Sequence, residues 1–181
     1  MPAPTDPVPG PGSATRGWGR VVLVGFVLAI LLRSFLFEQF YVQGPSMEPT
    51  LHEPSRVVVE KVTGGARSVR RGDVVVFEYQ TSEGRRDLIK RVIGVPGDLV
   101  EIRSCTVMVN SVPLDEPYVA QGPDCGTGDL AEMEVPDGEI FVMGDNRAHS
   151  SDSREFGTVR ISRVVGRAVL VVWPPSQWRA L

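Results

Sequence analysis

The sequence predicts a mainly β protein: an antiparallel β-sandwich or partly closed barrel with a small accessory β region, preceded by one N-terminal transmembrane helix. Three observations lead to this prediction. Short runs rich in Val and Ile, separated by turn residues, fill the chain from about residue 56 onward. No helical periodicity continues through them. A single unbroken apolar run, Val21 to Leu32, lies ahead of them.

The composition sets the size of the folded part. The chain has 181 residues, of which 42% are hydrophobic, and this suffices for one domain with a real core plus an accessory segment. The formal net charge is −3, so the charge balance gives no reason to expect nucleic acid as a partner.

The N-terminal region divides into a tail and an apolar run. Residues 1–17 are rich in Pro and Gly, have little to bury and are expected to be disordered. The run Val21 to Leu32 gives only about 18 Å of helix, whereas a bilayer core is about 30 Å thick. Residues 18–37 together reach about 30 Å if the Arg33 side chain extends to the interface. We therefore predict a transmembrane anchor over residues 18–37.

A cleaved signal peptide is the main alternative for this segment, because the length of its apolar core matches one. No small-x-small cleavage site follows the run, since the chain continues Arg33-Ser34-Phe35-Leu36. A retained anchor is therefore favoured. Arg16 and Arg20 before the run, against Arg33 after it, favour a cytoplasmic N-terminus by a small margin.

Beyond the anchor the pattern is typical of an antiparallel β domain without internal repeats. Residues 121–132 are rich in Gly and Asp and predict an exposed loop. The predicted strands are Arg56–Val62, Val74–Phe77, Asp87–Val95, Leu99–Ile102, Thr106–Asn110, Glu139–Met143 and Val164–Trp173.

The stretch Gln43–Leu51 holds the first candidate for chemistry. Pro49 is excluded from a helix interior, and the residue before it is pushed towards extended geometry. Ser46 is therefore displayed on a stiff, irregular piece of chain close to the predicted membrane surface. The alternative is a turn serine that only satisfies a backbone group.

A nucleophilic serine needs a base, and Lys90 is the candidate. His52 and His149 lie in no recognisable serine-hydrolase context. In a strand, Lys90 has apolar neighbours on its own face, so it loses hydration and its pKa falls towards neutrality. A neutral amine can accept the hydroxyl proton of Ser46. Alternation does not decide the matter, because Arg91 has an equally apolar face, and a lysine that reaches solvent is the alternative.

A third stretch, Met143–Arg154, is polar and directly follows a predicted strand. We expect it to form a packed hydrogen-bond network in which Ser150 orients the Lys90 amine and Asp152 pairs with Arg154. The alternative is an Asx-rich surface turn.

The two cysteines, Cys105 and Cys125, match no zinc or redox spacing. They either form one disulfide in an oxidising compartment or remain two ordinary thiols.

Four stretches in this order behind an anchor, GPSMEPTL, GDVVVF, IKRVIGVPGD and MGDNRAHSSDSR, resemble bacterial type I signal peptidases. The match runs from about Phe35 to about Trp173. The resemblance implies that Ser46 is the nucleophile and Lys90 the general base of a Ser-Lys dyad. It also implies cleavage of signal peptides from exported preproteins after small residues (A-x-A), on the outer face of the bacterial cytoplasmic membrane.

The resemblance implies roles for further residues. Ser150 matches the serine that hydrogen-bonds the lysine, and Asp152 and Arg154 match a structural pair beside it. Gly44 stands where many members carry a serine whose hydroxyl helps the oxyanion hole, so we expect water or a backbone group to substitute. The pocket for small substrate residues matches Phe40, Val42, Met47, Leu51, Leu88 and Ile89.

The organisation that follows has residues 1–17 as a cytoplasmic tail, 18–37 as a single span and 38–181 as the extracytoplasmic peptidase domain. The expected partners are signal peptides of secretory preproteins and the lipid bilayer, the protein is expected to be a monomer, and no metal or organic cofactor is expected. One alternative is a membrane-tethered β domain that binds a partner without catalysis. Another is a Ser-Lys self-processing peptidase, which the anchor disfavours.

Overall fold

The computed structural model describes residues 18–28, 37–61, 69–81, 84–119, 126 and 128–181. The chain divides into two compact units, residues 1–36 and 37–181. Within the first unit, residues 18–28 are helical. No helix among the described residues is both long and apolar enough to cross a membrane. The predicted anchor over 18–37 stays a prediction, because residues 29–36 lie outside the described part, as does the predicted disordered tail over 1–17.

Phe37 corrects one boundary of that prediction. It begins β1 (Phe37–Tyr41), where the sequence analysis placed the last residue of the span. β1 pairs with β2 (Arg56–Lys61) in an antiparallel register that sets Phe37 opposite Glu60 and Tyr41 opposite Arg56. The residues of β1, Phe-Glu-Gln-Phe-Tyr, show no period-2 alternation and follow directly on an apolar run, so this strand was not predicted.

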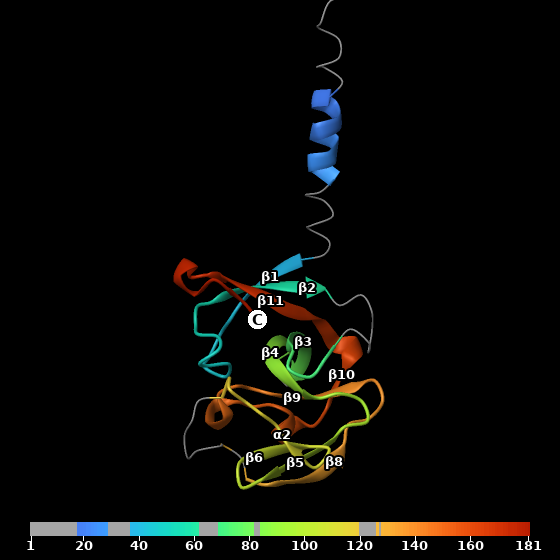
Figure 1. The fold of residues 1–181 in the computed structure, drawn as a ribbon, viewed down its shortest axis with the longest axis vertical. Helices are drawn as coiled ribbons and strands as arrows, with labels where there is room; N and C mark the ends of the chain where they lie inside the picture. The colour runs from blue at the N-terminus through green and yellow to red at the C-terminus, as the bar shows by residue number, and fades with distance from the viewer. Residues whose placement is uncertain (1–17, 29–36, 62–68, 82–83, 120–125, 127) are drawn as a thin grey trace, which may run out of the picture. The chain divides into compact units, whose positions relative to one another are not determined.

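The second unit is built from two antiparallel sheets (Figure 1). The larger sheet has eight strands in the order β1-β2-β11-β3-β4-β9-β10, with β12 paired to β11. The smaller sheet has four strands in the order β7-β6-β5-β8. The remaining strands of the larger sheet are β3 (Val74–Thr81), β4 (Gly84–Gly94), β9 (Glu139–Met143), β10 (Val159–Arg160), β11 (Val164–Trp173) and β12 (Arg179–Ala180). Those of the smaller sheet are β5 (Leu99–Arg103), β6 (Thr106–Val109), β7 (Val112–Pro113) and β8 (Leu130–Glu134).

Each strand predicted from the sequence is present, and the small accessory sheet is confirmed. Two details were wrong. The larger sheet is open, because its terminal strands β1 and β10 do not pair with each other, so the partly closed barrel is not formed. The predicted loop over 121–132 ends early, because β8 begins at Leu130. Leu130 and Met133 pack against the core beneath the accessory sheet, and this packing outweighs the Gly- and Asp-rich composition before them.

The core explains why the middle of the sheet suits a site. β3 is buried on both faces: Val74 and Val76 belong to one core cluster, and Val75 and Phe77 to another. Figure 1 shows β3 and β4 between the β1-β2-β11 side and the accessory strands. The residues of β4 from Lys90 to Gly94 are all buried as a result. Apolar side chains on β4 and β9 form a third cluster with the accessory sheet.

The structure gives the bonding state of one of the two cysteines. Cys105, in the turn between β5 and β6, is disulfide-bonded. The chain's other cysteine, Cys125, lies outside the described part of the chain.

Candidate active site

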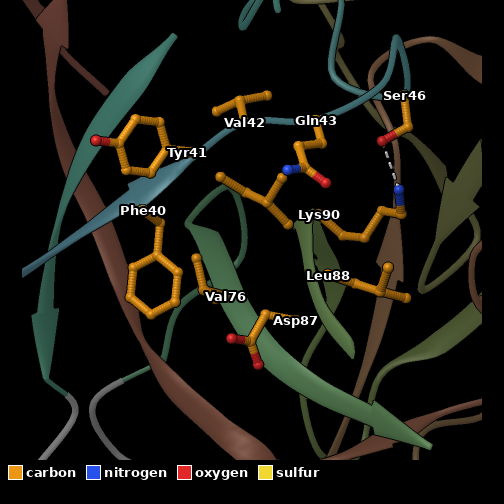
Figure 2. A pocket seen from close by; sticks show the side chains of 10 residues that line it. Phe40, Tyr41, Val42, Gln43, Ser46, Val76, Asp87, Leu88 and Lys90 are labelled. Atoms are coloured by element: carbon orange, nitrogen blue, oxygen red, sulfur yellow. Dashed lines mark hydrogen bonds between the residues drawn. The ribbon is translucent and has the colours of Figure 1, made fainter. Parts of the chain in front are cut away.

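Ser46 and Lys90 meet at the centre of the site. The Lys90 amine lies 2.6 Å from the Ser46 hydroxyl oxygen and donates a hydrogen bond to it (Figure 2). Lys90 comes from β4, and Ser46 from the turn between β1 and β2. The pairing expected from the sequence is therefore formed across 44 positions of chain.

The turn that carries Ser46 is anchored to the core by its own apolar side chains. Met47 and Leu51 are fully buried in the core, and the Leu51 N–H donates to the Met47 carbonyl at 2.8 Å. Gly44 has a φ of +78°, a left-handed conformation that favours glycine. Its N–H donates to the Glu53 carboxylate at 2.9 Å. These contacts fix the direction in which the hydroxyl of Ser46 points.

The surroundings of the Lys90 amine favour its neutral form, which can act as a base. The residue is 3% exposed. Burial lowers the pKa of Lys90 from 10.5 to about 8, because a desolvated ammonium loses hydration. The carboxylates of Asp152 and Asp145 oppose this effect, and the Arg154 guanidinium adds to it. Within the described residues Lys90 forms no ion pair, and with a pKa of about 8 roughly half of the amine is neutral at about pH 8 and about a tenth at pH 7.

The loop after β9 clamps the Ser46 turn through its backbone. The Asn146 N–H donates to the Ser46 carbonyl at 3.1 Å, and the Asn146 side-chain amide donates to the Pro45 carbonyl at 3.2 Å. Gly144 lies against the same turn: a Cβ there would meet the Ser46 carbonyl oxygen at 2.4 Å and the Ser150 hydroxyl at 2.3 Å. Sequence analysis named neither Gly144 nor Asn146 individually, and their position in a polar run after a strand was the only signal.

The expected Asp152–Arg154 pair is present and buried. The Arg154 guanidinium donates to both carboxylate oxygens of Asp152, at 2.8 and 2.9 Å. It also donates to the Arg147 carbonyl at 2.8 Å, while Asp152 accepts the Gly144 N–H at 2.9 Å. Desolvation acts against the carboxylate, but these hydrogen bonds prevail and hold the pKa of Asp152 below its usual value.

Ser150 departs from its expected contact. Its hydroxyl is buried and has no hydrogen-bond partner among the described residues, so the bond expected to Lys90 is not formed in this structure. The hydroxyl does lie close enough to Asp152 to help lower the pKa of that carboxyl.

Two buried arginine pairs were not predicted. Arg91, next to Lys90 on β4, donates to both oxygens of Asp145 at 2.8 and 2.7 Å, and its guanidinium lies 4.0 Å from the centre of the Tyr118 ring. Arg147 donates to both oxygens of Glu116. Burial, followed by the Glu116 carboxylate, raises the pKa of Tyr118 above its usual value. A single sequence holds no signal for these long-range pairs.

A pocket of about 100 Å³ opens beside the dyad. In Figure 2 Ser46 and Lys90 lie at one end of it, with Phe40 and Val76 at the other. Its lining residues are Phe40, Tyr41, Val42, Gln43, Ser46, Val76, Asp87, Leu88, Ile89 and Lys90.

Four of the six residues expected at this pocket line it: Phe40, Val42, Leu88 and Ile89. Met47 and Leu51 do not, because both are fully buried in the core cluster that contains Val42. They support the pocket wall from behind.

Few hydrogen-bond donors among the described residues lie near Ser46, where they could stabilise negative charge on a substrate carbonyl oxygen under attack. Among the described residues no hydrogen bond uses the Ser46 N–H, which leaves that group available. The Gly44 N–H is engaged by Glu53 and is not free to substitute for the missing side-chain donor. In the part of the chain that the structure describes, no cluster of His, Cys, Asp and Glu is placed to hold a metal ion. A hydroxyl, a poised amine and a free N–H together form a geometry suited to acyl transfer.

The sequence of the chain is similar to those of known proteins. The family described as "Signal peptidase, peptidase S26" matches residues 15–173. A signal peptidase I of Bacillus amyloliquefaciens is 39% identical over 165 residues, covering 87% of this chain and 84% of that one. Signal peptidase I T of Bacillus subtilis (strain 168) is 37% identical over 170 residues, covering 90% and 87%. A crystal structure of a signal peptidase I from Enterococcus faecalis V583 has a TM-score of 0.47 and 33% identity, covering 55% of this chain and 95% of that one.

Proposed function

Because this chain belongs to the peptidase S26 family of signal peptidases, we propose that it is a serine endopeptidase that removes signal peptides from exported preproteins. Ser46 is the nucleophile and Lys90 the general base. The observation that carries the proposal is the 2.6 Å contact between the Ser46 hydroxyl and a Lys90 amine that is 3% exposed. Burial of that amine supports its neutral form, which the chemistry requires.

The substrate segment binds in an extended conformation along β4. Residues 84–90 of β4 pair with β3 on one side, whereas β9 pairs only with residues 91–94 on the other. Among the described residues no strand pairs with this second edge over Asp87–Lys90, which line the pocket, and an unpaired strand edge suits the addition of a substrate strand. The pocket is small, about 100 Å³, and the apolar side chains of Phe40, Val42, Val76, Leu88 and Ile89 form part of its wall, which favours small residues such as alanine at an A-x-A site.

Catalysis proceeds by acyl transfer. The Ser46 oxygen attacks the scissile carbonyl carbon while the Lys90 amine takes the hydroxyl proton. The Ser46 N–H donates to the oxygen that gains negative charge. The carbon–nitrogen bond then breaks, and the Lys90 ammonium gives its proton to the leaving amine. Water attacks the resulting ester, Lys90 accepts the proton of that water, and Ser46 leaves with a proton restored.

We place the enzyme in the bacterial cytoplasmic membrane, with a single anchor within residues 18–36 and the catalytic unit on the outer face. Enzyme and preprotein are then confined to one surface, which raises their effective concentration. The slight excess of arginine before the apolar run supports this orientation.

The test is cleavage of a purified preprotein by the purified full chain in detergent. We expect a cut after an A-x-A site that is lost in both Ser46→Ala and Lys90→Ala. Lys61→Ala is the matched control, because Lys61 is the only other lysine and is largely exposed on β2. A chain that binds the preprotein without cutting it, under conditions where a known signal peptidase cuts, supports the binding module instead.

A further inference from the structure

A buried ion pair links the accessory sheet to the active-site loop. Glu116 follows β7, the edge strand of the accessory sheet, and Arg147 begins the short 3-10 turn η2 (Arg147–His149) after β9. The guanidinium donates to both carboxylate oxygens, at 3.0 and 2.5 Å. The side chains are 13% and 7% exposed. A two-point ion pair at this depth fixes the position and orientation of both partners.

Arg147 transmits that fixation to the backbone beside the dyad. Its third guanidinium donor, Nε, bonds the Gly144 carbonyl at 3.1 Å. Gly144 packs directly against the Ser46 carbonyl, and Asn146 donates its N–H to the same carbonyl. Two residues, Arg147 and Gly144, therefore connect Glu116 to the main chain of Ser46.

Tyr118 connects the same carboxylate to the loop by a second route. Its hydroxyl donates to Glu116 at 3.0 Å, and the Arg91 guanidinium lies over its ring. Arg91 in turn holds Asp145 through two hydrogen bonds. Two independent chains of contacts thus lead from Glu116 to consecutive loop residues: through Arg147 to Gly144, and through Tyr118 and Arg91 to Asp145.

We propose that Glu116 is a positioning residue for the Ser46–Lys90 pair, which it holds in register through Arg147 and the loop of residues 144–147. The accessory sheet thereby becomes a working part of the active site, with no contact of its own to substrate. The proposal rests on the proposed peptidase function for its kinetic consequence. A displacement of about 1 Å at reacting atoms costs on the order of 100-fold in rate, so the loop has to be held rigidly.

The kinetic test compares Glu116→Gln with its neighbour Asp115→Asn. Both changes remove one negative charge, but Asp115 is exposed and its side chain makes no hydrogen bond among the described residues. We expect Glu116→Gln to lower kcat about tenfold or more, with KM unchanged because none of Glu116, Arg147, Tyr118 and Arg91 lines the pocket. Asp115→Asn keeps both constants. A kcat equal to that of the wild type, or a loss that only follows the folded fraction, overturns the proposal.

Tyr118→Phe keeps the proposal testable if Glu116→Gln does not fold. It removes a single hydroxyl and retains the ring beneath Arg91. We expect a several-fold lower kcat at unchanged KM. Wild-type kcat in Tyr118→Phe would in that case count against the proposal.

A second readout does not need cleavage at all. Because Lys61 and Lys90 are the only lysines, protein labelled with [13Cε]lysine gives two side-chain signals by NMR. Desolvation by burial is the largest cause of the lowered pKa of Lys90 and outweighs the charges of Asp145, Asp152 and Arg154. A loosened loop in Glu116→Gln admits water to the amine and is therefore expected to move the Lys90 titration up from about 8 towards 10.5, while the Lys61 signal stays in place.

The two readouts separate the two proposals. If the wild-type chain cuts no preprotein while the Lys90 titration still shifts in Glu116→Gln, the peptidase function fails and the positioning role stands. If the preprotein is cut and neither kcat nor the Lys90 titration changes in Glu116→Gln, the positioning role fails and the peptidase function stands.

Discussion

Lys90 and Arg91 are adjacent on β4, and both side chains are buried, but only that of Arg91 is hydrogen-bonded to a carboxylate. The Arg91 guanidinium makes two hydrogen bonds to Asp145, whereas Lys90 makes none to any carboxylate among the described residues. Burial beside a carboxylate keeps a cation charged, and burial without one favours the neutral amine. Position 90 is therefore suited to proton transfer and position 91 to holding the loop.

The pH dependence of cleavage is expected to follow the Lys90 amine. Its pKa is lowered to about 8, and only the neutral form accepts the Ser46 proton. We expect kcat/KM to rise with pH, with a midpoint near 8, and to be lost as pH falls through that value. A kcat/KM profile of the full chain between pH 5 and pH 10 (roughly the range that brackets this pKa) measures it. A flat profile through pH 8 contradicts the neutral-amine mechanism.

Replacing Lys90 with methionine is expected to stabilise the folded unit at neutral pH. The unfolded lysine, with a pKa of 10.5, binds a proton more strongly than the buried one, so stability rises as pH increases from about 8 to 10.5. Lys90→Met removes this penalty, a gain on the order of 1–3 kcal/mol at pH 7 that disappears above pH 10.5. Urea unfolding at both pH values measures the difference, with Lys61→Met as the control. Equal unfolding midpoints for Lys90→Met and wild type at pH 7 argue against a desolvated amine.

Gly144→Ala is expected to inactivate the protein. The added Cβ meets the Ser46 carbonyl at 2.4 Å and the Ser150 hydroxyl at 2.3 Å, so the loop and the serine turn have to separate. Overpacking of this kind costs about 1–3 kcal/mol. Gly128→Ala, where nothing lies within 4 Å of the new Cβ, is the matched control. Thermal unfolding and preprotein cleavage measure both variants, and normal cleavage by Gly144→Ala would show that the loop does not clamp Ser46.

Arg154→Met is expected to lower the free energy of unfolding by about 3–5 kcal/mol, because it leaves the buried Asp152 carboxylate without its partner. Arg85→Met, which breaks an exposed pair with Glu78, is expected to change it by less than about 0.5 kcal/mol. Urea unfolding compares the two. A similar decrease in the free energy of unfolding in both variants would mean that the buried Asp152–Arg154 pair stabilises the fold no more than an exposed pair does.

Patterns along the chain predicted most of the larger sheet, since strands such as β2, β9 and β11 combine β-branched residues with flanking turn signals. The two-residue strands β7, β10 and β12 carry no such pattern, because they are too short to show alternation. Their pairing is set by the strands beside them.

The Ser46–Lys90 pair was predicted only with the help of the family resemblance. Alternation left Lys90 and Arg91 equivalent, and the structure gives the reason: both faces of this part of β4 are buried. Met47 and Leu51 were expected at the pocket because the family resemblance implied it, yet both pack inward. Contacts such as Asn146 to Pro45 and Arg147 to Glu116 join residues far apart in the chain, where local pattern carries no information.

The position of β11 between β2 and β3 has a consequence for protein synthesis. β11 leaves the ribosome after both of the strands that it joins, so the larger sheet lacks its connection between β2 and β3 while the chain is still growing. The loop of residues 144–147, which contacts the backbone of Ser46, also leaves the ribosome late. A nascent chain thus carries Ser46 and Lys90 well before it has the scaffold that brings them together, and a chain stopped before β11 is never completed into a working molecule.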